Sequence, residues 1–181
     1  MSGKLIVLTG VHNVVRRVVS ADTEAFSAIP YYPSISDALQ QRDASSHWET
    51  CPFYESLLMY RELERDSAIL ALIEERNVIA LIEQWHVGNI AWAKTRSSEV
   101  GIEYEERLRE LLERLGEVDI RTWHISTDLE KMSAASFRSA YQMYLGELSN
   151  ITRHFRLPVE TLDGDAPIEI VSKRVKYLLR G

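Results

Sequence analysis

Short runs of consecutive apolar residues recur along the chain, and each has the length of a β-strand that is buried on both faces. The clearest run is Leu5–Leu8, which is followed by Thr9 and Gly10. Pro158 lies near the start of the last run and favours an edge position or a strand entry there, because proline donates no hydrogen bond to a sheet. The expected strands are Leu5–Leu8, Ala28–Tyr32, Asn77–Ile82, Val118–Ile125 and Leu157–Leu162.

Apolar residues recur at helical spacing in the segments between these runs. Asp165 is a candidate N-cap for the last of these segments, with Pro167 in its first turn. The segment Val14–Val19 has the sequence VVRRVV, which fits a helix or a strand. The expected helices are Tyr54–Glu75, Glu103–Leu115, Ala134–Phe155 and Ile168–Leu179.

Strands that alternate with helices predict βαβ units, and therefore an α/β fold: a three-layer sandwich around a mainly parallel sheet. The chain contains no internal repeat and no linker rich in proline, glycine or serine, so residues 1–181 are expected to form a single domain. Ligands of such sheets bind beyond the carboxyl ends of the strands. Candidate site residues are therefore sought directly after each strand.

Composition narrows the possible partners. The net charge of −6 argues against broad binding to nucleic-acid backbone, which needs a basic surface. No apolar run approaches the roughly 20 residues that cross a bilayer, so no membrane span is expected. Cys51 is the only cysteine, which excludes an internal disulfide and favours the cytoplasm as the location.

Three segments carry a family resemblance. Lys4–Gly10 resembles the first strand and opening turn of phosphate-binding kinases. Glu83–Trp92, with the sequence EQWHVGNIAW, is similar to the Asp-Arg-Tyr segment of thymidylate kinases and the Glu-Arg segment of deoxynucleoside kinases. Leu157–Val171 resembles the last strand, aspartate and closing helix of these families. The resemblance implies a P-loop nucleotide kinase-like fold, thymidylate kinase-like in detail. It also implies a nucleotide or nucleoside-like ligand, with ATP and Mg²⁺ as cofactors.

The chain departs from the family where phosphates are held. Counted from Gly10, a phosphate-binding loop needs Gly, Lys and Ser or Thr where this chain has Val15, Arg16 and Arg17. Gln84 replaces the arginine of the strand-end motif, and the lid segment around Ser126–Ser133 contains a single basic residue. The loop is therefore degenerate, and weak or absent phosphoryl transfer is expected.

The resemblance implies roles for particular residues. Glu83 would orient the nucleophile or Mg²⁺, and Arg16 would neutralise phosphate charge; these are the candidate catalytic residues. Candidate nucleotide-binding residues are Gly10, Val11, His12, Asn13, Arg16 and Arg17. Candidate substrate-binding residues are Tyr32, Arg61, Arg65, Trp85 and Asn89.

Each of these residues also has a structural interpretation. Arg16 and Arg17 are either an anion site near a helix N-terminus or a solvated pair. Arg61 and Arg65 interrupt an apolar stripe and either point toward a cleft or form ion pairs. Glu83 either serves a site or caps the next turn. Candidates for stacking on a base, or for packing alone, are Tyr31, Tyr32, Trp48, Trp85 and Trp92.

Other patterns indicate structure rather than chemistry. The five histidines show no metal-ligand spacing, so no metal site is expected. Trp123 and His124 lie within a strand pattern and are expected in the core. The charge run Glu105–Arg114 is typical of a solvated helix face with ion pairs.

Two functions stay open at this point. The chain is either a nucleoside or nucleotide kinase relative that still binds its ligand, or a pseudokinase that acts as a protein-interaction or scaffold subunit. Whether it is an enzyme is uncertain. A protein partner or a homodimer would use the long helix expected at Tyr54–Glu75 or the one at Ala134–Phe155.

Overall fold

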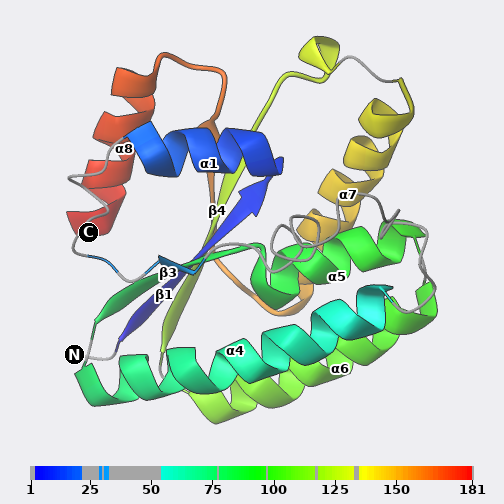
Figure 1. The fold of residues 1–181 in the computed structure, drawn as a ribbon, viewed down its shortest axis with the longest axis vertical. Helices are drawn as coiled ribbons and strands as arrows, with labels where there is room; N and C mark the ends of the chain where they lie inside the picture. Colours follow the sequence, from blue (N-terminus) through cyan, green and yellow to red (C-terminus); the bar gives the residue numbers. More distant parts are fainter. Residues whose placement is uncertain are drawn as a thin grey trace.

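The chain folds around one five-stranded parallel sheet, as the sequence predicts. The structure is a computed structural model that describes residues 3–21, 29, 31–32, 54–76, 78–96, 98–116, 118–132 and 135–180. The strands lie in the order β2-β3-β1-β4-β5, and every neighbouring pair is parallel. Helices cover both faces of the sheet, which confirms the three-layer α/β sandwich (Figure 1).

The strands correspond closely to the apolar runs. β1 lies at the centre of the sheet, between β3 and β4, so the segment before Gly10 is the most enclosed strand. β5 lies at an edge, where a proline directly before the strand interrupts no ladder. The bounds are Lys4–Gly10 for β1, Tyr31–Tyr32 for β2, Ile79–Glu83 for β3, Asp119–Ser126 for β4 and Val159–Asp163 for β5.

The helices include α1, which settles the ambiguous VVRRVV segment as helical. Val15 and Val18, three residues apart, are buried against the sheet, and this spacing suits a helix rather than a strand. The bounds are His12–Ala21 for α1, Tyr54–Arg76 for α4, Trp85–Arg96 for α5, Ser98–Leu115 for α6, Ala135–His154 for α7 and Ile168–Arg180 for α8. A short 3-10 helix, η2, spans Leu129–Lys131.

Asp165 does not cap α8, and the expectation that it would is wrong. The helix begins at Ile168, and its first bonds run from Ile170 and Val171 to the carbonyl of Pro167. The Asp165 carboxylate instead accepts hydrogen bonds from Thr127 Oγ1 at 3.0 Å and from the backbone N–H of Asp128 at 2.5 Å. It therefore joins the β5–α8 turn to the segment after β4.

Side chains alternate between two cores along the central strand. Leu5 and Val7 contact the face covered by α4, α5, α6 and α7, whereas Ile6 and Leu8 contact the face covered by α1 and α8. This period of two explains why β1 is a continuous apolar run: both of its faces are buried. No helix among the described residues is both long and apolar enough to cross a membrane.

Candidate functional site

Polar side chains gather at the carboxyl end of β3. Glu83 is the last residue of this strand and is fully buried, although it carries a carboxylate. The hydroxyl of Tyr31, from β2, donates to Glu83 Oε2 at 2.8 Å. The strand-end position predicted for Glu83 is confirmed. Tyr31, considered from the sequence as a stacking residue, contributes here through its hydroxyl group.

Helix α4 supplies a buried ion pair beside this carboxylate. Arg65 Nε and Nη2 donate to the two oxygens of Glu62 at 2.8 and 2.6 Å. Arg65 Nη2 also lies 3.4 Å from the carbonyl of Glu83, and Asn89 Nδ2 donates to Glu62 Oε1 at 2.7 Å. Burial raises the pKa of Glu62, while the adjacent guanidinium lowers it. The structure thus brings three predicted residues, Glu83, Arg65 and Asn89, into one cluster.

Glu62 is the member of this cluster that sequence reasoning missed. A signal for it does exist, since Glu62 precedes Arg65 by three residues on a helix, a spacing at which opposite charges meet. Arg61 behaves differently, because its side chain is 49% exposed and pairs with Glu64 at 2.7 Å. The sequence left both arginines open between a cleft and an ion pair. Both form an ion pair with a glutamate three residues away, Arg65 at 10% exposure and Arg61 at the surface.

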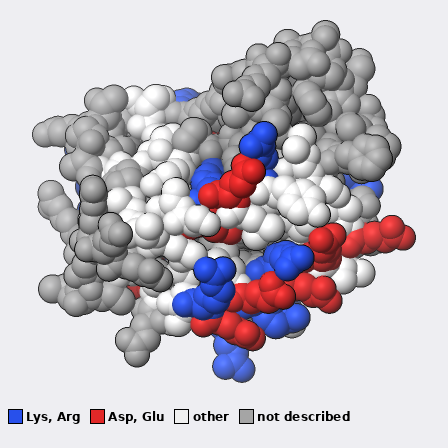
Figure 2. Space-filling view, turned by 60° about the horizontal axis from the view of Figure 1, so that its bottom comes forward, with Lys and Arg blue, Asp and Glu red and all other residues white. Residues whose placement is uncertain are grey.

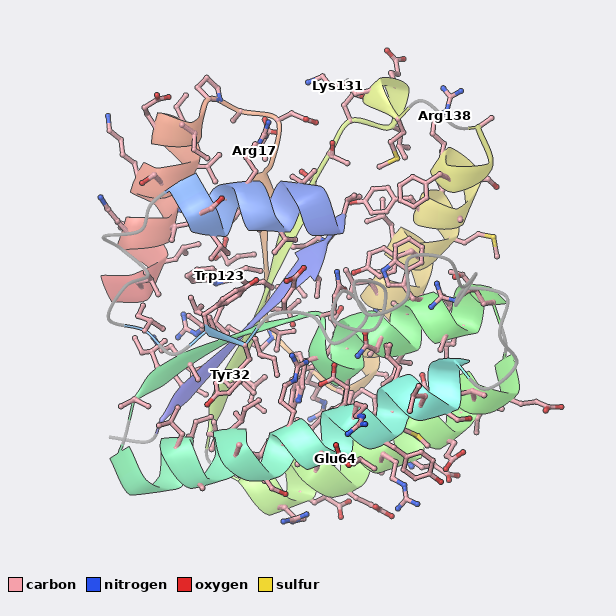
Figure 3. All side chains as sticks on the ribbon, in the orientation of Figure 1. Arg17, Tyr32, Glu64, Trp123, Lys131 and Arg138 are labelled. Carbon is pink, nitrogen blue, oxygen red and sulfur yellow. The ribbon has the colours of Figure 1, made fainter. Side chains whose placement is uncertain are left out.

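The two aromatic candidates for substrate contact are placed differently from each other. Trp85 is 1% exposed, and its Nε1 donates to Asp66 Oδ1 at 2.7 Å. Stacking of a base on this ring would require the core around it to open. Tyr32 is half-buried near the carboxyl end of β3 and packs against the same core (Figure 3).

The turn after β1 is shorter than a phosphate-binding loop. β1 ends at Gly10, and α1 begins at His12 after a single intervening residue. The N–H groups of Val14 and Val15 are bonded to the carbonyl of Val11 at 2.9 and 3.0 Å, as the first bonds of a helix. Several successive free N–H groups are needed to wrap a phosphate chain. Between β1 and α1 the chain leaves only Val11 for such a loop.

Arg16 and Arg17 consequently lie in the second turn of α1. This corrects the expectation that they sit near a helix N-terminus. The side chain of Arg17 is exposed. The side chains of His12, Asn13 and Arg16 lie outside the described residues, and the roles expected of them stay predictions.

Gln84, which replaces the family's arginine, fastens the turn to the rest of the site. Its backbone N–H donates to the carbonyl of Leu8 at 2.7 Å, and its Nε2 donates to the carbonyl of Gly10 at 2.7 Å. The hydroxyl of Tyr144 donates to its Oε1 at 3.3 Å. Gln84 and Trp85 both have positive φ, 61° and 44°, a strained pair of conformations for residues other than glycine. The loss of charge at this position therefore accompanies a structural role for the neutral amide.

Gly10 is held in place by its surroundings. Its φ of 136° is one that residues with a side chain rarely adopt. A Cβ there would also collide with the carbonyl oxygen of Ile125, on the neighbouring strand β4. The resemblance assigns Gly10 to phosphate binding. Its conformation and its close approach to β4 are sufficient reason for a glycine.

A second buried cluster lies at the carboxyl ends of β1 and β4. Thr9 Oγ1 lies 3.2 Å from His124 Nδ1, and the hydroxyl of Tyr141 lies 3.2 Å from Nε2 of the same ring. Burial lowers the pKa of His124 to about 4 and raises the pKa of Tyr141 to about 12. The ring is therefore neutral at neutral pH. His124 and Trp123 are buried, as the sequence predicts, but their hydrogen-bonding partners could not be foreseen from it.

Aromatic side chains of α5 and α7 back this cluster. Trp92 stacks on Tyr144 at 4.4 Å between centroids, and Tyr144 stacks on Tyr141 at 5.7 Å. The Trp92 ring, a candidate for base stacking, thus already stacks on Tyr144, and Phe137 lies in a stacked arrangement with it at 6.2 Å between centroids. Tyr144 also donates to Gln84, so the stack is linked through that amide to the Gly10 turn.

Basic residues on three elements lie in the upper part of the molecule as Figure 3 shows it. They are Arg17 of α1, Lys131 of η2 and Arg138 of α7. Lys131 Nζ lies 3.7 Å from Asp165, whose pKa is lowered chiefly by the backbone hydrogen bond from Asp128. Arg138 lies beyond Ser126–Ser133, the segment taken as the lid, so the sequence did not point to it. No group of three or more potential metal ligands occurs among the residues that the structure describes.

The chain is similar in structure to two solved proteins. One is the NadR protein, solved in complex with NAD and AMP-PNP, with 14% identity and a TM-score of 0.66. The match covers 98% of this chain and 49% of NadR, so the chain spans about half the length of that protein. Another is deoxyadenosine kinase from M. mycoides, solved with dCMP and dCDP, with 7% identity, a TM-score of 0.53, and 97% and 98% of the two chains covered.

A second structure of that kinase, with dATP bound, gives 9% identity and a TM-score of 0.50, and covers 98% of this chain and all of the other (100%). No family model matches the sequence, and no curated protein matches it. At such low identities the likeness establishes the fold alone. The chain shares its three-layer α/β fold with these proteins.

Proposed function

We propose that the chain binds a nucleotide or nucleoside-like ligand at the carboxyl end of β3, with weak or no ATP-dependent phosphoryl transfer. The observation that carries this proposal is the start of α1 at His12, immediately after the Gly10 turn. The buried cluster of Glu83, Arg65 and Asn89 is retained beside a turn that lacks a phosphate cradle. Binding of a kinase-type ligand without a phosphate donor is the simplest function that fits both the buried cluster and the short turn before α1.

The residues at the Gly10 turn do not fit the triphosphate of ATP. Val14 and Val15 use their N–H groups within α1, and the lysine and Ser/Thr of a phosphate-binding loop are absent. Phosphoryl transfer depends almost wholly on positioning and on charge at these positions. Thymidylate kinase-like chemistry, implied by the strand-end segment, therefore has little support at the donor side. ATP and Mg²⁺ remain ligands to be tested.

The cluster at β3 favours a ligand that carries N–H donors. Glu83 is an acceptor, and one amide hydrogen of Asn89 is held by Glu62. No described residue donates to Asn89 Oδ1, so this oxygen is an acceptor. An amino-bearing base complements a carboxylate and an amide oxygen better than an anionic phosphate does. NadR and deoxyadenosine kinase, which share the fold, were both solved with nucleotides.

The test is calorimetric titration of the purified chain with nucleosides, nucleoside monophosphates and ATP, with and without Mg²⁺. Glu83→Gln is expected to weaken the best-binding nucleoside or monophosphate at least tenfold, about 1.4 kcal/mol. The amide oxygen can still accept from Tyr31, while the negative charge and the second acceptor oxygen are lost. Glu64→Gln is the matched control, because Glu64 is exposed and pairs with Arg61 alone among the described residues. It is expected to leave the affinity unchanged.

Micromolar, Mg²⁺-dependent ATP binding with product formation would contradict the proposal and make the chain a kinase. If none of these compounds binds at millimolar concentration, the pseudokinase interpretation replaces it. The surface of α8 gives that alternative some support, since Ile170 and Tyr177 are 59% and 68% exposed. Light scattering coupled to size exclusion would then show whether the chain forms a homodimer.

A further inference from the structure

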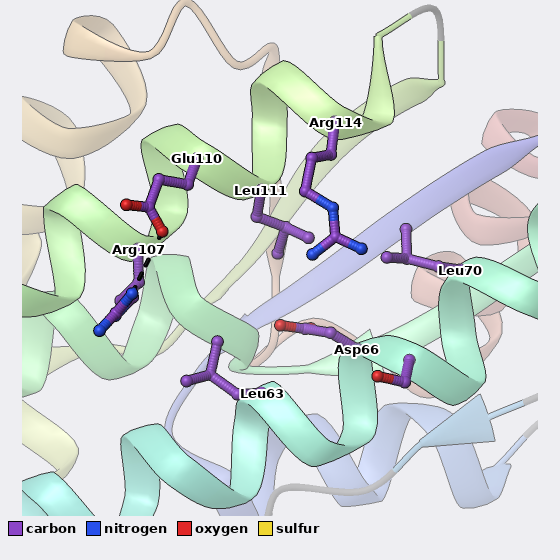
Figure 4. A pocket seen from close by; sticks show the side chains of 8 residues that line it. Leu63, Asp66, Leu70, Arg107, Glu110, Leu111 and Arg114 are labelled. Carbon is purple, nitrogen blue, oxygen red and sulfur yellow. Dashed lines mark hydrogen bonds and ion pairs between the residues drawn. The ribbon is translucent and has the colours of Figure 1, made fainter.

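A hollow of about 190 Å³ lies between α4 and α6, apart from the Gly10 turn. Its apolar lining comes from Leu63 and Leu70 of α4 and from Leu111 of α6 (Figure 4). This is the side of the molecule that Figure 2 brings forward, where acidic and basic side chains are interspersed. The hollow is therefore a mixed site, with an aliphatic wall and charged groups around it.

Opposite charges face this hollow from its two walls. Asp66 of α4 is 5% exposed, and its oxygens accept hydrogen bonds from Trp85 Nε1 and His86 Nε2 at 2.7 and 2.6 Å. Arg114 of α6 points into the same space from the opposite side (Figure 4). No ion pair joins Arg114 to any residue that the structure describes, whereas Arg107 is paired with Glu110 at 3.2 Å.

The helical ion pairs expected of the charge run on α6 thus account for Arg107 but not for Arg114. A guanidinium facing a pocket is suited to a planar carboxylate, which it binds through two parallel hydrogen bonds. The Asp66 carboxylate, held in place by two donors, is suited to an ammonium group. The leucine side chains that line the hollow beside these charges favour an aliphatic body attached next to the charged groups. Each part of the lining therefore complements a different part of one small molecule.

The volume sets the size of that molecule. An apolar cavity of about 150 Å³ takes benzene, with six non-hydrogen atoms. A hollow somewhat larger accommodates a few atoms more. We propose that the hollow between α4 and α6 binds a small zwitterion with an apolar body, of the class of the aliphatic α-amino acids.

The experiment is calorimetric titration of the full chain with L-leucine and with two analogues. 4-Methylpentanoate lacks the ammonium group, and 3-methylbutylamine lacks the carboxylate. L-Leucine is expected to bind, and each analogue to bind at least tenfold more weakly, because it leaves one charge of the hollow unmatched. Arg114→Gln is expected to weaken L-leucine at least tenfold. Arg109→Gln, an exposed arginine of α6 outside the hollow, is the matched control and is expected to have no effect.

Arg114 and Ser67 are both exposed, so substitutions there leave the core intact. Ser67→Phe fills the hollow from the α4 side and is expected to abolish binding without lowering the thermal midpoint. Three results would overturn the proposal. The first is no heat with L-leucine at about 10 mM. The second is equal affinity for L-leucine and the two analogues. The third is an equal loss in the Arg114 and Arg109 variants.

Discussion

Replacement of Arg65 by methionine is expected to lower the free energy of unfolding by about 3–5 kcal/mol, because it leaves the charge of Glu62 buried and unpaired. Glu62 is fully buried, and Arg65 supplies most of its hydrogen bonds. Methionine keeps an unbranched apolar stem and removes the guanidinium with its charge and hydrogen bonds. Urea denaturation, monitored by circular dichroism, measures the change.

The same helix provides a matched control. Arg61 and Glu64 are three residues apart, like Glu62 and Arg65. The side chains of Arg61 and Glu64 are exposed, whereas those of the other pair are largely buried. Arg61→Met is expected to cost about 0–1 kcal/mol, the value of a solvated pair. The double variant Glu62→Gln with Arg65→Met removes both charges and is expected to regain more than half of the loss. Equal losses in the two single variants would show that burial does not set the strength of the pair.

This contrast also shows where sequence reasoning stopped. Arg61 and Arg65 lie four residues apart, so a helical pattern places them on neighbouring parts of one face. What separates them is the contact of Arg65 with Glu62 and the carbonyl of Glu83. The second of these comes from a strand eighteen residues further along the chain. A local pattern identified the strand end and the helix, and only the packing of α4 on β3 decided which arginine lies inside.

The fold was accessible from sequence because its signals are local. Runs buried on both faces identified β1, β3 and β4, and Pro158 identified an edge strand. The VVRRVV segment was ambiguous because its β-branched valines favour a strand, while apolar residues four positions apart fit a helix. Its helical state depends on Val15 and Val18 packing into the core shared with α8, a contact that spacing alone does not contain.

At the Gly10 turn, one feature could be predicted from the sequence and another depends on packing. The missing lysine and glycine were visible in the sequence, and they predicted a degenerate loop. The consequence was not visible: α1 begins almost at once, and the amide of Gln84 occupies the carbonyl of Gly10. Gln84 is 1% exposed, so a guanidinium there would need a buried counter-charge. The Gly10 turn and the strand end at Gln84 are therefore connected in space.

His124 is expected to make the protein less stable as the pH falls from about 6.5 to about 4. Burial lowers the pKa of this ring to about 4 in the folded state, from 6.5 when exposed. Between these values the unfolded chain binds a proton that the folded chain does not, so stability rises with pH. The difference of about 2.5 units corresponds to about 3 kcal/mol, present above pH 6.5 and lost by pH 4.

The variant His124→Gln isolates this contribution, because the other buried titrating groups remain. Tyr141, which faces the ring, has a pKa of about 12 and does not titrate in this range. The raised pKa of Glu62 acts in the opposite sense, since the folded state takes up that proton first and gains stability as the pH falls. Urea unfolding at intervals between pH 4 and pH 7 should therefore give a shallower decline for His124→Gln than for the unaltered chain. His154→Gln, at the exposed end of α7, should retain the full decline. A parallel decline in all three proteins would show that the His124 ring accepts its proton without breaking its contacts with Thr9 and Tyr141.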